Sequence, residues 1–472
     1  MAINNIKTKY ILYLLFLWLG YTAVYWRYSN TYIGLKEVSL LGYFAVVQLL
    51  ITLYSWYKIS GVVIDAFSVF TIVFYCFNLS QPILETLGLS VEFRQLWGGG
   101  YGTSNNSYFS AVYFSMASAL FFHIGALIAH KGSSSGSLLY NDVDNSYIIS
   151  SIRKAAFVFS LFSAPFYIYN LVKSIAIVQV FGYQGLYNIE YTSRVFAILG
   201  DMFTPAMIAL FTTSMLDGYR VKLVGVLVGA LIFLPPFILG GKANAMIVLA
   251  IVYIIIASIK KVNLKRLVLG AVLILGMLYI SNIITSTRIE GGRSVAILQE
   301  ASKESESPII STIQEMGWSM YPLVLTMESV PYYKDYSYGA SYFWAVVSLI
   351  PNLGFWSGEH PGKKNDPAQW LNEKSGENYG IGYSMVAGAY NELGYIGLLI
   401  MFLYGVLFCK IFANVSPEAA FKKPLQFIFA LLFLWYAIKF VRNSLNGIAR
   451  GLAYYVLPIY LLSKFYIKGK LR

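Results

Sequence analysis

Several cationic side chains lie where apolar runs of the sequence end, and these are the residues best placed to do chemistry. Lys242 lies between two apolar runs in the turn 239–243, and Arg288 and Arg293 follow a later run in the glycine-containing segment 287–293. Guanidinium groups match phosphate oxygens through paired hydrogen bonds, and a helix N-terminus adds positive potential. These cations are therefore candidates for a diphosphate-binding site, and each also fits a cation that anchors a helix end at a membrane surface.

Two further arginines occupy similar positions. Arg442 opens a short polar turn between two apolar runs, and Arg194 ends the polar segment before another. Each alone is typical of a residue that contacts lipid headgroups. With the three cations above, they would form a ring of positive charge on one side of a membrane.

Two residues are candidates for acid–base catalysis. His360 lies in the polar segment 358–364, and histidine has the side-chain pKa nearest to neutral pH. Glu392 lies in an otherwise apolar stretch, where a carboxylate is costly unless it has a partner or a function. The simpler explanations are an incidental loop histidine and a glutamate paired with a basic helix end.

The segment 318–356 is rich in aromatic side chains. Aromatic faces stack on the C–H faces of sugars, and aromatic residues also form belts at membrane interfaces. Both interpretations remain open at this point. The residues are Trp318, Tyr321, Tyr332, Tyr333, Tyr336, Tyr338, Tyr342, Phe343, Trp344, Phe355 and Trp356.

The elements that must position these residues are membrane helices. Of 472 residues, 57% are hydrophobic and 12% are charged, whereas soluble domains carry about 25% charged residues. This composition excludes a soluble enzyme and a disordered chain, and the alternating segments of an outer-membrane barrel are absent. The sequence therefore predicts an all-α polytopic membrane protein.

Twelve apolar runs are candidates for helices that cross about 30 Å of hydrocarbon, the last being short. Lys and Arg are denser in the loops on the side of the N-terminus, which predicts that both chain ends are cytoplasmic. The net charge of +13 is then a consequence of topology and implies no nucleic acid. The runs cover about 10–26, 38–57, 61–78, 108–129, 155–172, 195–216, 223–239, 243–259, 267–285, 382–408, 424–440 and 451–463.

The runs divide the chain into three parts. Residues 1–285 form transmembrane helices 1–9, residues 286–381 a large periplasmic loop with short helices, and residues 382–472 transmembrane helices 10–12. One large loop late in the chain differs from the matched halves of an inverted-repeat transporter.

The sequence has no signature of a bound cofactor. Glycine-rich dinucleotide-binding and Walker A patterns are absent, and the external segments carry no acidic cluster for a metal. Residues 142–144 have the Asp-x-Asp spacing of metal-dependent glycosyltransferases, but without a surrounding βαβ unit they are interpreted as a solvated loop. We therefore expect neither a cofactor nor a metal.

An ordered set of segments, 315–322, 338–342, 382–385 and 389–397, resembles the bacterial oligosaccharide repeat-unit polymerases, the O-antigen polymerase Wzy family. The likeness covers about 235–400, and the residues before it match in hydropathy only.

The O-antigen ligases are more distant relatives. Their Ser-Arg-Gly turn is similar to Gly241-Lys242-Ala243 here, with lysine in place of arginine. They place a histidine at the head of the late helix, where this chain has Ser384. The resemblance therefore leaves the catalytic base unassigned: His360 or Glu392 would substitute for that histidine, or the reaction needs no strong base.

The resemblance implies a GT-C-like fold in the bacterial inner membrane, with the active site facing the periplasm. It implies that the growing glycan moves from undecaprenyl diphosphate to the terminal sugar of another undecaprenyl-diphosphate-linked repeat unit, with inversion and without a metal. A Wzz-type co-polymerase that regulates chain length and a flippase would be its partners. The residues expected to stabilise the diphosphate leaving group are Lys242, Arg288, Arg293, Arg442 and Arg194.

Three alternatives remain. An O-antigen ligase would share the donor but deliver the glycan to the lipid A core. A flippase or exporter of the lipid-linked glycan should carry cations along a path through the membrane, and basic residues inside the apolar runs are nearly absent, Lys439 being the main one. A membrane scaffold would leave the external cations unexplained.

Overall fold

Every regular element that the structure describes is a helix, which confirms the all-α prediction for these residues. The structure is a computed structural model of the chain. It describes residues 2–31, 33–89, 104–131, 142–181, 185–186, 194–216, 235, 239, 242–259, 272, 276, 279, 307–351, 356–357, 359–376 and 380–469.

The chain forms two compact units, each built from several stretches of sequence. The first unit comprises Met1–Gly136, Ile313–Ala413 and Ala437–Arg450, and the second comprises Ser137–Thr312, Asn414–Tyr436 and Gly451–Arg472.

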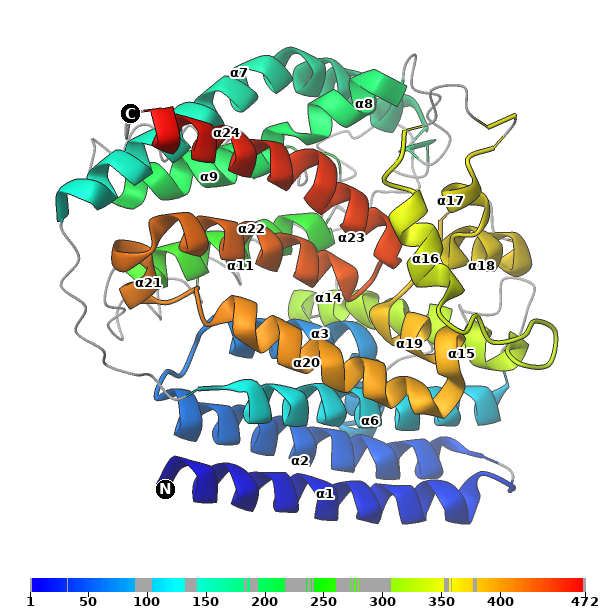
Figure 1. Ribbon diagram of the computed structural model, residues 1–472. Helices are drawn as coiled ribbons and strands as arrows, with labels where there is room; N and C mark the ends of the chain where they lie inside the picture. The colour runs from blue at the N-terminus through cyan, green and yellow to red at the C-terminus, as the bar shows by residue number, and fades with distance from the viewer. Residues whose placement is uncertain are drawn as a thin grey trace. The chain divides into compact units, whose positions relative to one another are not determined.

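Long helices laid side by side make up most of the first unit (Figure 1). They are α1 (Ala2–Tyr28), α2 (Leu35–Ser60), α6 (Asn105–Ala129) and α20 (Leu398–Phe412). The backbones of α6 and α20 approach closely because Gly405 has no side chain: a Cβ there would fall 1.9 Å from the carbonyl oxygen of Phe122. Small residues at such crossings are typical of helices that associate within a membrane.

The apolar run predicted at 61–78 corresponds to α3 (Ala66–Asn78), and a second helix, α4 (Ser80–Thr86), follows it directly. The two helices meet at an angle of 72°. Pro82 lacks the N–H that would bond to the carbonyl of Asn78, and its ring crowds that carbonyl. The helical path therefore continues past the predicted boundary, in a new direction.

Short helices fill the described part of the predicted loop 286–381 and the start of the following run. They are not all on the surface, since Leu323 and Val324 of α15 are fully buried and α15 packs against α6 and α19. These elements are α14 (Pro308–Gly317), η2 (Trp318–Met320), α15 (Tyr321–Ser329), α16 (Ala340–Val347), α17 (Pro361–Lys364), α18 (Pro367–Ser375), α19 (Met385–Leu393) and η3 (Gly394–Gly397).

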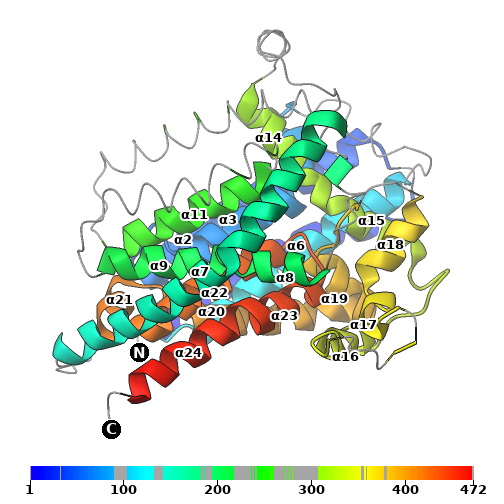
Figure 2. The same ribbon diagram turned by 90° about the horizontal axis from the view of Figure 1, so that it is seen from above.

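In the second unit, the 40-residue helix α7 (Asp142–Phe181) packs against α9 and α24, and these helices lie side by side in Figure 2.

Residues 142–144, interpreted above as a solvated loop, belong to the first turn of α7 instead. The prediction was wrong because a helix can continue where apolar residues give way to polar ones. The other elements are α8 (Arg194–Asp201), α9 (Phe203–Leu216), α11 (Lys242–Ile259), α21 (Pro417–Lys422), α22 (Pro424–Phe440), α23 (Leu445–Gly451), η4 (Leu452–Val456) and α24 (Leu457–Gly469), of which α22 and α23 have residues in both units.

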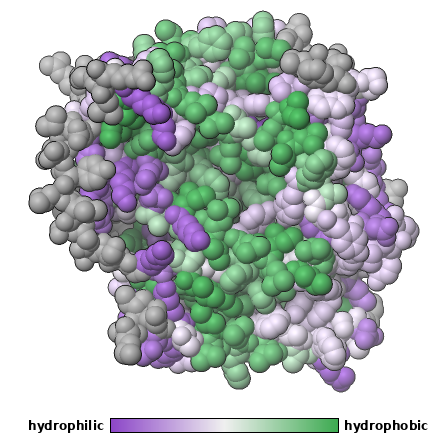
Figure 3. Space-filling model, viewed as in Figure 1, coloured by the Kyte–Doolittle hydropathy of each residue, from purple (hydrophilic) through white to green (hydrophobic). Residues whose placement is uncertain are grey.

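Five helical stretches of the described residues are long and apolar enough to cross a membrane, and a sixth if α3 and α4 form one span. Exposed apolar side chains such as Leu399 and Leu403 of α20 suit contact with lipid, and apolar side chains cover much of the view in Figure 3. Most of the runs 223–239 and 267–285 lies outside the described residues, so the count of twelve stays a prediction. The five stretches are Lys36–Ser60, Asn105–Ala129, Asn145–Phe181, Val195–Leu216 and Met385–Phe412.

Candidate functional site

Two of the segments that carry the family resemblance, 338–342 and 389–397, lie against each other in the first unit. The N–H of Tyr338 donates to the carbonyl of Glu392 (3.1 Å), and the N–H of Ser337 donates to the carbonyl of Asn391 (2.8 Å). The Asn391 side-chain amide donates to the hydroxyl of Ser337 (2.8 Å). The turn before α16 is therefore held by the end of α19.

Local sequence signals explain where α19 begins and ends. The hydroxyl of Ser384 accepts the N–H of Ala387 (3.0 Å) and caps the start of the helix. The helix ends at Gly394, which has a φ of 58° and whose Cβ, if present, would fall 2.7 Å from the Tyr336 hydroxyl. Only glycine allows this turn to approach Tyr336.

Glu392 lies at the centre of this contact and is 1% exposed. Its Oε2 accepts the N–H of Gly339 at 2.6 Å. Its Oε1 is buried and has no hydrogen-bond partner among the described residues. A buried carboxylate is costly unless its acceptor sites are used, so the spare oxygen marks Glu392 as a candidate for function.

A cavity of about 20 Å³ lies beside Glu392, which is room for one water molecule. Tyr404 donates a hydrogen bond to Tyr342 in its wall (3.1 Å). Burial and the negative charge of Glu392 raise the pKa of Tyr342 to about 12, so this hydroxyl remains protonated at neutral pH. The polar residues of the lining are Ser341, Tyr342, Tyr383, Ser384, Glu392, Tyr404 and Asn446.

His360 has a different environment from the one expected of a free base. Its Nδ1 accepts the N–H of Gly362 (2.9 Å), so Nε2 carries the ring proton and donates to the carbonyl of Ile350 (2.8 Å). Its ring contacts that of Trp356, with the centroids 4.4 Å apart. Both nitrogens are therefore engaged, and His360 does not line the cavity at Glu392.

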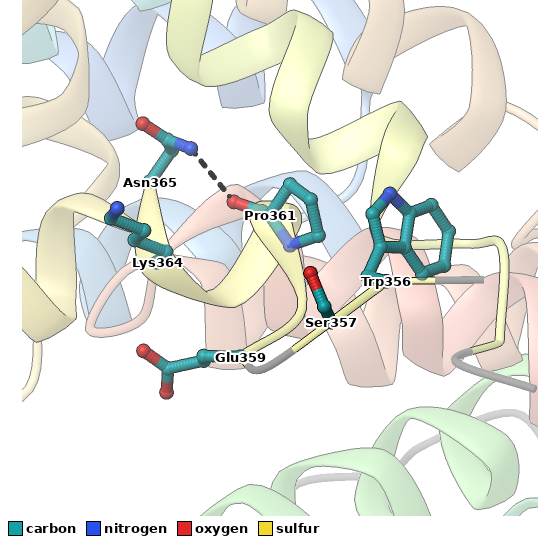
Figure 4. A pocket seen from close by; sticks show the side chains of 6 residues that line it. All are labelled: Trp356, Ser357, Glu359, Pro361, Lys364 and Asn365. Atoms are coloured by element: carbon teal, nitrogen blue, oxygen red, sulfur yellow. Dashed lines mark hydrogen bonds between the residues drawn. The ribbon is translucent and has the colours of Figure 1, made fainter. Parts of the chain in front are cut away.

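A surface pocket of about 440 Å³ lies next to His360 in the sequence. The amide of Asn365 donates to the carbonyl of Pro361 (2.8 Å) and closes the short helix α17 there (Figure 4). His360 does not line this pocket either. Its lining residues are Trp356, Ser357, Glu359, Pro361, Lys364 and Asn365.

Of the five predicted cations, Arg442 is the one whose side chain the structure describes. Arg442 is exposed, with its guanidinium 5.6 Å from the centre of the Phe77 ring. Lys242 and Arg194 are the first residues of α11 and α8, but their side chains lie outside the described part of the structure. Arg288 and Arg293 lie outside the described residues altogether, so the diphosphate site stays a prediction.

Comparison with known families decides the relationship that the segments suggested. The family model of the O-antigen polysaccharide polymerase Wzy matches residues 3–470. The chain belongs to the Wzy family. Wzy polymerases act in the membrane on lipid-linked oligosaccharide repeat units. The match also covers the N-terminal region, where the sequence showed a likeness in hydropathy only. No curated protein and no solved structure matches the chain.

Sequence reasoning missed a polar network that supports the candidate Wzy site. Asp366 caps α18 by accepting the N–H of Ala368 (3.0 Å), and its other carboxylate oxygen accepts the hydroxyl of Ser444 (3.1 Å). The Asn446 amide donates to the carbonyl of Gly362 (2.8 Å). Since Asn446 also lines the cavity at Glu392, the network fixes part of the cavity wall. The Asp-Pro pair that opens α18 was a readable signal for the cap.

Replacing Asp366 by asparagine is expected to stabilise the protein at neutral pH. Burial raises the pKa of the Asp366 carboxyl, so the fold favours its neutral form. The resulting penalty is absent below the unfolded pKa of about 3.9, grows as pH rises from there to the folded pKa, and is constant above it. Asparagine stays neutral and keeps an oxygen acceptor, so Asp366→Asn should exceed wild type in Tm by more at pH 7.5 than at pH 4. Thermal unfolding in detergent tests this, and a difference independent of pH would contradict it.

Proposed function

We propose that this chain polymerises lipid-linked oligosaccharide repeat units in the bacterial inner membrane, at a site facing the periplasm in a GT-C-like fold. Membership of the Wzy family supports the reaction class. The observation that carries the assignment of the site is Glu392. It is a buried carboxylate with one oxygen that has no hydrogen-bond partner among the described residues, held where two segments that carry the family resemblance meet.

The proposed reaction is a single displacement. The terminal sugar hydroxyl of one undecaprenyl-diphosphate-linked unit attacks the anomeric carbon of the growing glycan, and the bond from that carbon to the undecaprenyl diphosphate breaks. The hydroxyl proton passes to Glu392 Oε1 through the water that its cavity can hold. One displacement inverts the anomeric configuration.

The leaving diphosphate gains negative charge as the bond breaks, and fixed cations stabilise that charge without a metal. We assign this role to Lys242, Arg288 and Arg293, with Arg442 and Arg194 as further contributors. Glu392 serves as base in preference to His360, because a hydrogen bond from Gly339 orients its carboxylate and leaves one oxygen unused, whereas both nitrogens of His360 are engaged. A flippase that supplies the repeat units and a Wzz-type chain-length regulator are the partners this function requires.

The reaction can be tested with the purified protein in lipid nanodiscs and its cognate undecaprenyl-diphosphate-linked repeat unit. We expect longer lipid-linked glycans at a rate that a divalent-metal chelator leaves unchanged. NMR of the product should show the new linkage with the anomeric configuration opposite to that of the donor. Retained configuration would contradict the single displacement, and abolition by the chelator would contradict the metal-independent mechanism. Transfer only to added lipid A core would indicate a ligase.

A further inference from the structure

The turn between α15 and α16 presents aromatic rings to solvent next to Glu392. Tyr332 is 80% exposed and Tyr338 is 73% exposed. The ring of the half-buried Tyr336 contacts that of Tyr338 (6.0 Å between centroids) and that of the buried Tyr390 (6.1 Å). Tyr332 lies in the same turn, six residues before Tyr338. We call Tyr332 and Tyr338 the tyrosine surface.

The backbone of Tyr338 is strained in a way that fixes this arrangement. Its φ is 45°, and it alone among the described non-glycine residues has a positive φ. A bulky residue in the left-handed region costs about 1–3 kcal/mol and persists only where the surroundings impose it. The surroundings here are the Glu392 carbonyl, which accepts the N–H of Tyr338 (3.1 Å), and the Glu392 carboxylate, which accepts the next N–H. The exposed ring of Tyr338 is thus placed by the candidate base itself.

The chemistry around this turn favours a sugar over lipid as the ligand. Asp335 and Glu373 are exposed, and the ammonium of Lys374 lies 4.2 Å from the centre of the Tyr333 ring. Charged groups of both signs would be costly in contact with hydrocarbon, whereas the exposed face of α20 carries leucines such as Leu399 and Leu403. Exposed aromatic rings beside carboxylates can stack on a pyranose ring and accept hydrogen bonds from its hydroxyls.

We propose that the tyrosine surface binds the terminal saccharide of the acceptor, with Tyr338 and Tyr332 as positioning and specificity-determining residues. The inference rests on the proposed function and deepens it, because it names the part of the substrate that meets this site. Stacking places the sugar ring at the turn that Glu392 holds. The ligand class is a neutral oligosaccharide, and its lipid is not needed for recognition at this surface.

The test uses binding, so that it does not depend on catalysis. The probe is the repeat-unit oligosaccharide released from its lipid, added to the full-length protein in nanodiscs and followed by saturation-transfer NMR. The variants are Tyr338→Asn, Tyr332→Ala and their combination. Asparagine adopts the left-handed backbone more readily than alanine, so the first variant removes the ring without added strain. Tyr338→Phe keeps the ring, and Tyr43→Ala removes an exposed tyrosine from the membrane-facing helix α2.

We expect each single variant to weaken oligosaccharide binding about tenfold and the double variant to abolish it. Tyr338→Phe, Tyr43→Ala and Glu392→Gln should bind as wild type does. If the wild-type protein binds the oligosaccharide but does not polymerise repeat units, the proposed function is contradicted and the saccharide site is still supported. Binding by the double variant equal to that of wild type, or no binding by wild type, would overturn the saccharide site.

Discussion

Glu392→Gln is expected to reduce glycan polymerisation by about 10²- to 10⁴-fold, the usual contribution of a general base. Glutamine is nearly the same size as glutamate. Its side-chain carbonyl oxygen can accept the hydrogen bond that Gly339 N–H donates to Glu392 Oε2 in the wild type (2.6 Å). It cannot take up the acceptor proton. The measurement is the initial rate of repeat-unit addition by purified protein in nanodiscs, normalised to folded protein.

A second substitution at the same position separates catalysis from folding. Glu392→Ala leaves the Gly339 N–H without its acceptor, which should cost about 1–3 kcal/mol of stability in addition to the lost activity. Glu418→Gln, which removes an exposed carboxylate from α21, should retain full activity. A near-normal rate for Glu392→Gln, with only Glu392→Ala impaired, would show that Glu392 merely holds the turn.

Arg288→Ala and Arg293→Ala should each slow polymerisation about 10- to 1000-fold, which corresponds to about 2–4 kcal/mol of lost stabilisation of the leaving diphosphate. Lysine at either position should give an intermediate rate, because it keeps the charge but loses the bidentate fork. Membrane levels of each variant should be unchanged by immunoblot. The effect should fall on the rate at saturating donor, since the charge develops in the transition state.

The matched control for the two arginines is Lys303→Ala, which removes another cation from the same predicted loop. It should polymerise as wild type does. Full activity in both arginine variants would remove the diphosphate clamp from the mechanism. An equal loss in Lys303→Ala would indicate a general effect of positive charge on the substrate's approach.

Parts of this fold were readable from the sequence because hydropathy reports them directly. The apolar runs 108–129 and 424–440 correspond closely to α6 (Asn105–Ala129) and α22 (Pro424–Phe440). Hydropathy fails where a helix passes into polar sequence, so the first turns of α7 were interpreted as a loop. It also fails at α3 and α4, where Pro82 bends a continuous helical path by 72°.

The candidate site was only partly readable for a different reason. Glu392 stood out as a carboxylate in apolar sequence, but its partner Gly339 is 53 residues away, and no local pattern reports such a pairing. The hydrogen bond that engages His360 Nε2 likewise depends on Ile350, ten residues away. The strained backbone of Tyr338 follows from the hydrogen bonds that Tyr338 and Gly339 make to Glu392. No local sequence pattern predicts it.

The most direct test of the central claim is glycan-ladder formation in the cognate bacterium with its own polymerase gene deleted. Complementation with the wild-type chain should restore a ladder of surface glycans of increasing length, and Glu392→Gln at equal membrane level should leave a single capped repeat unit. If the wild-type chain accumulates in the membrane and still restores no ladder, the polymerase assignment is wrong, and transport or ligation of the lipid-linked glycan becomes the better account.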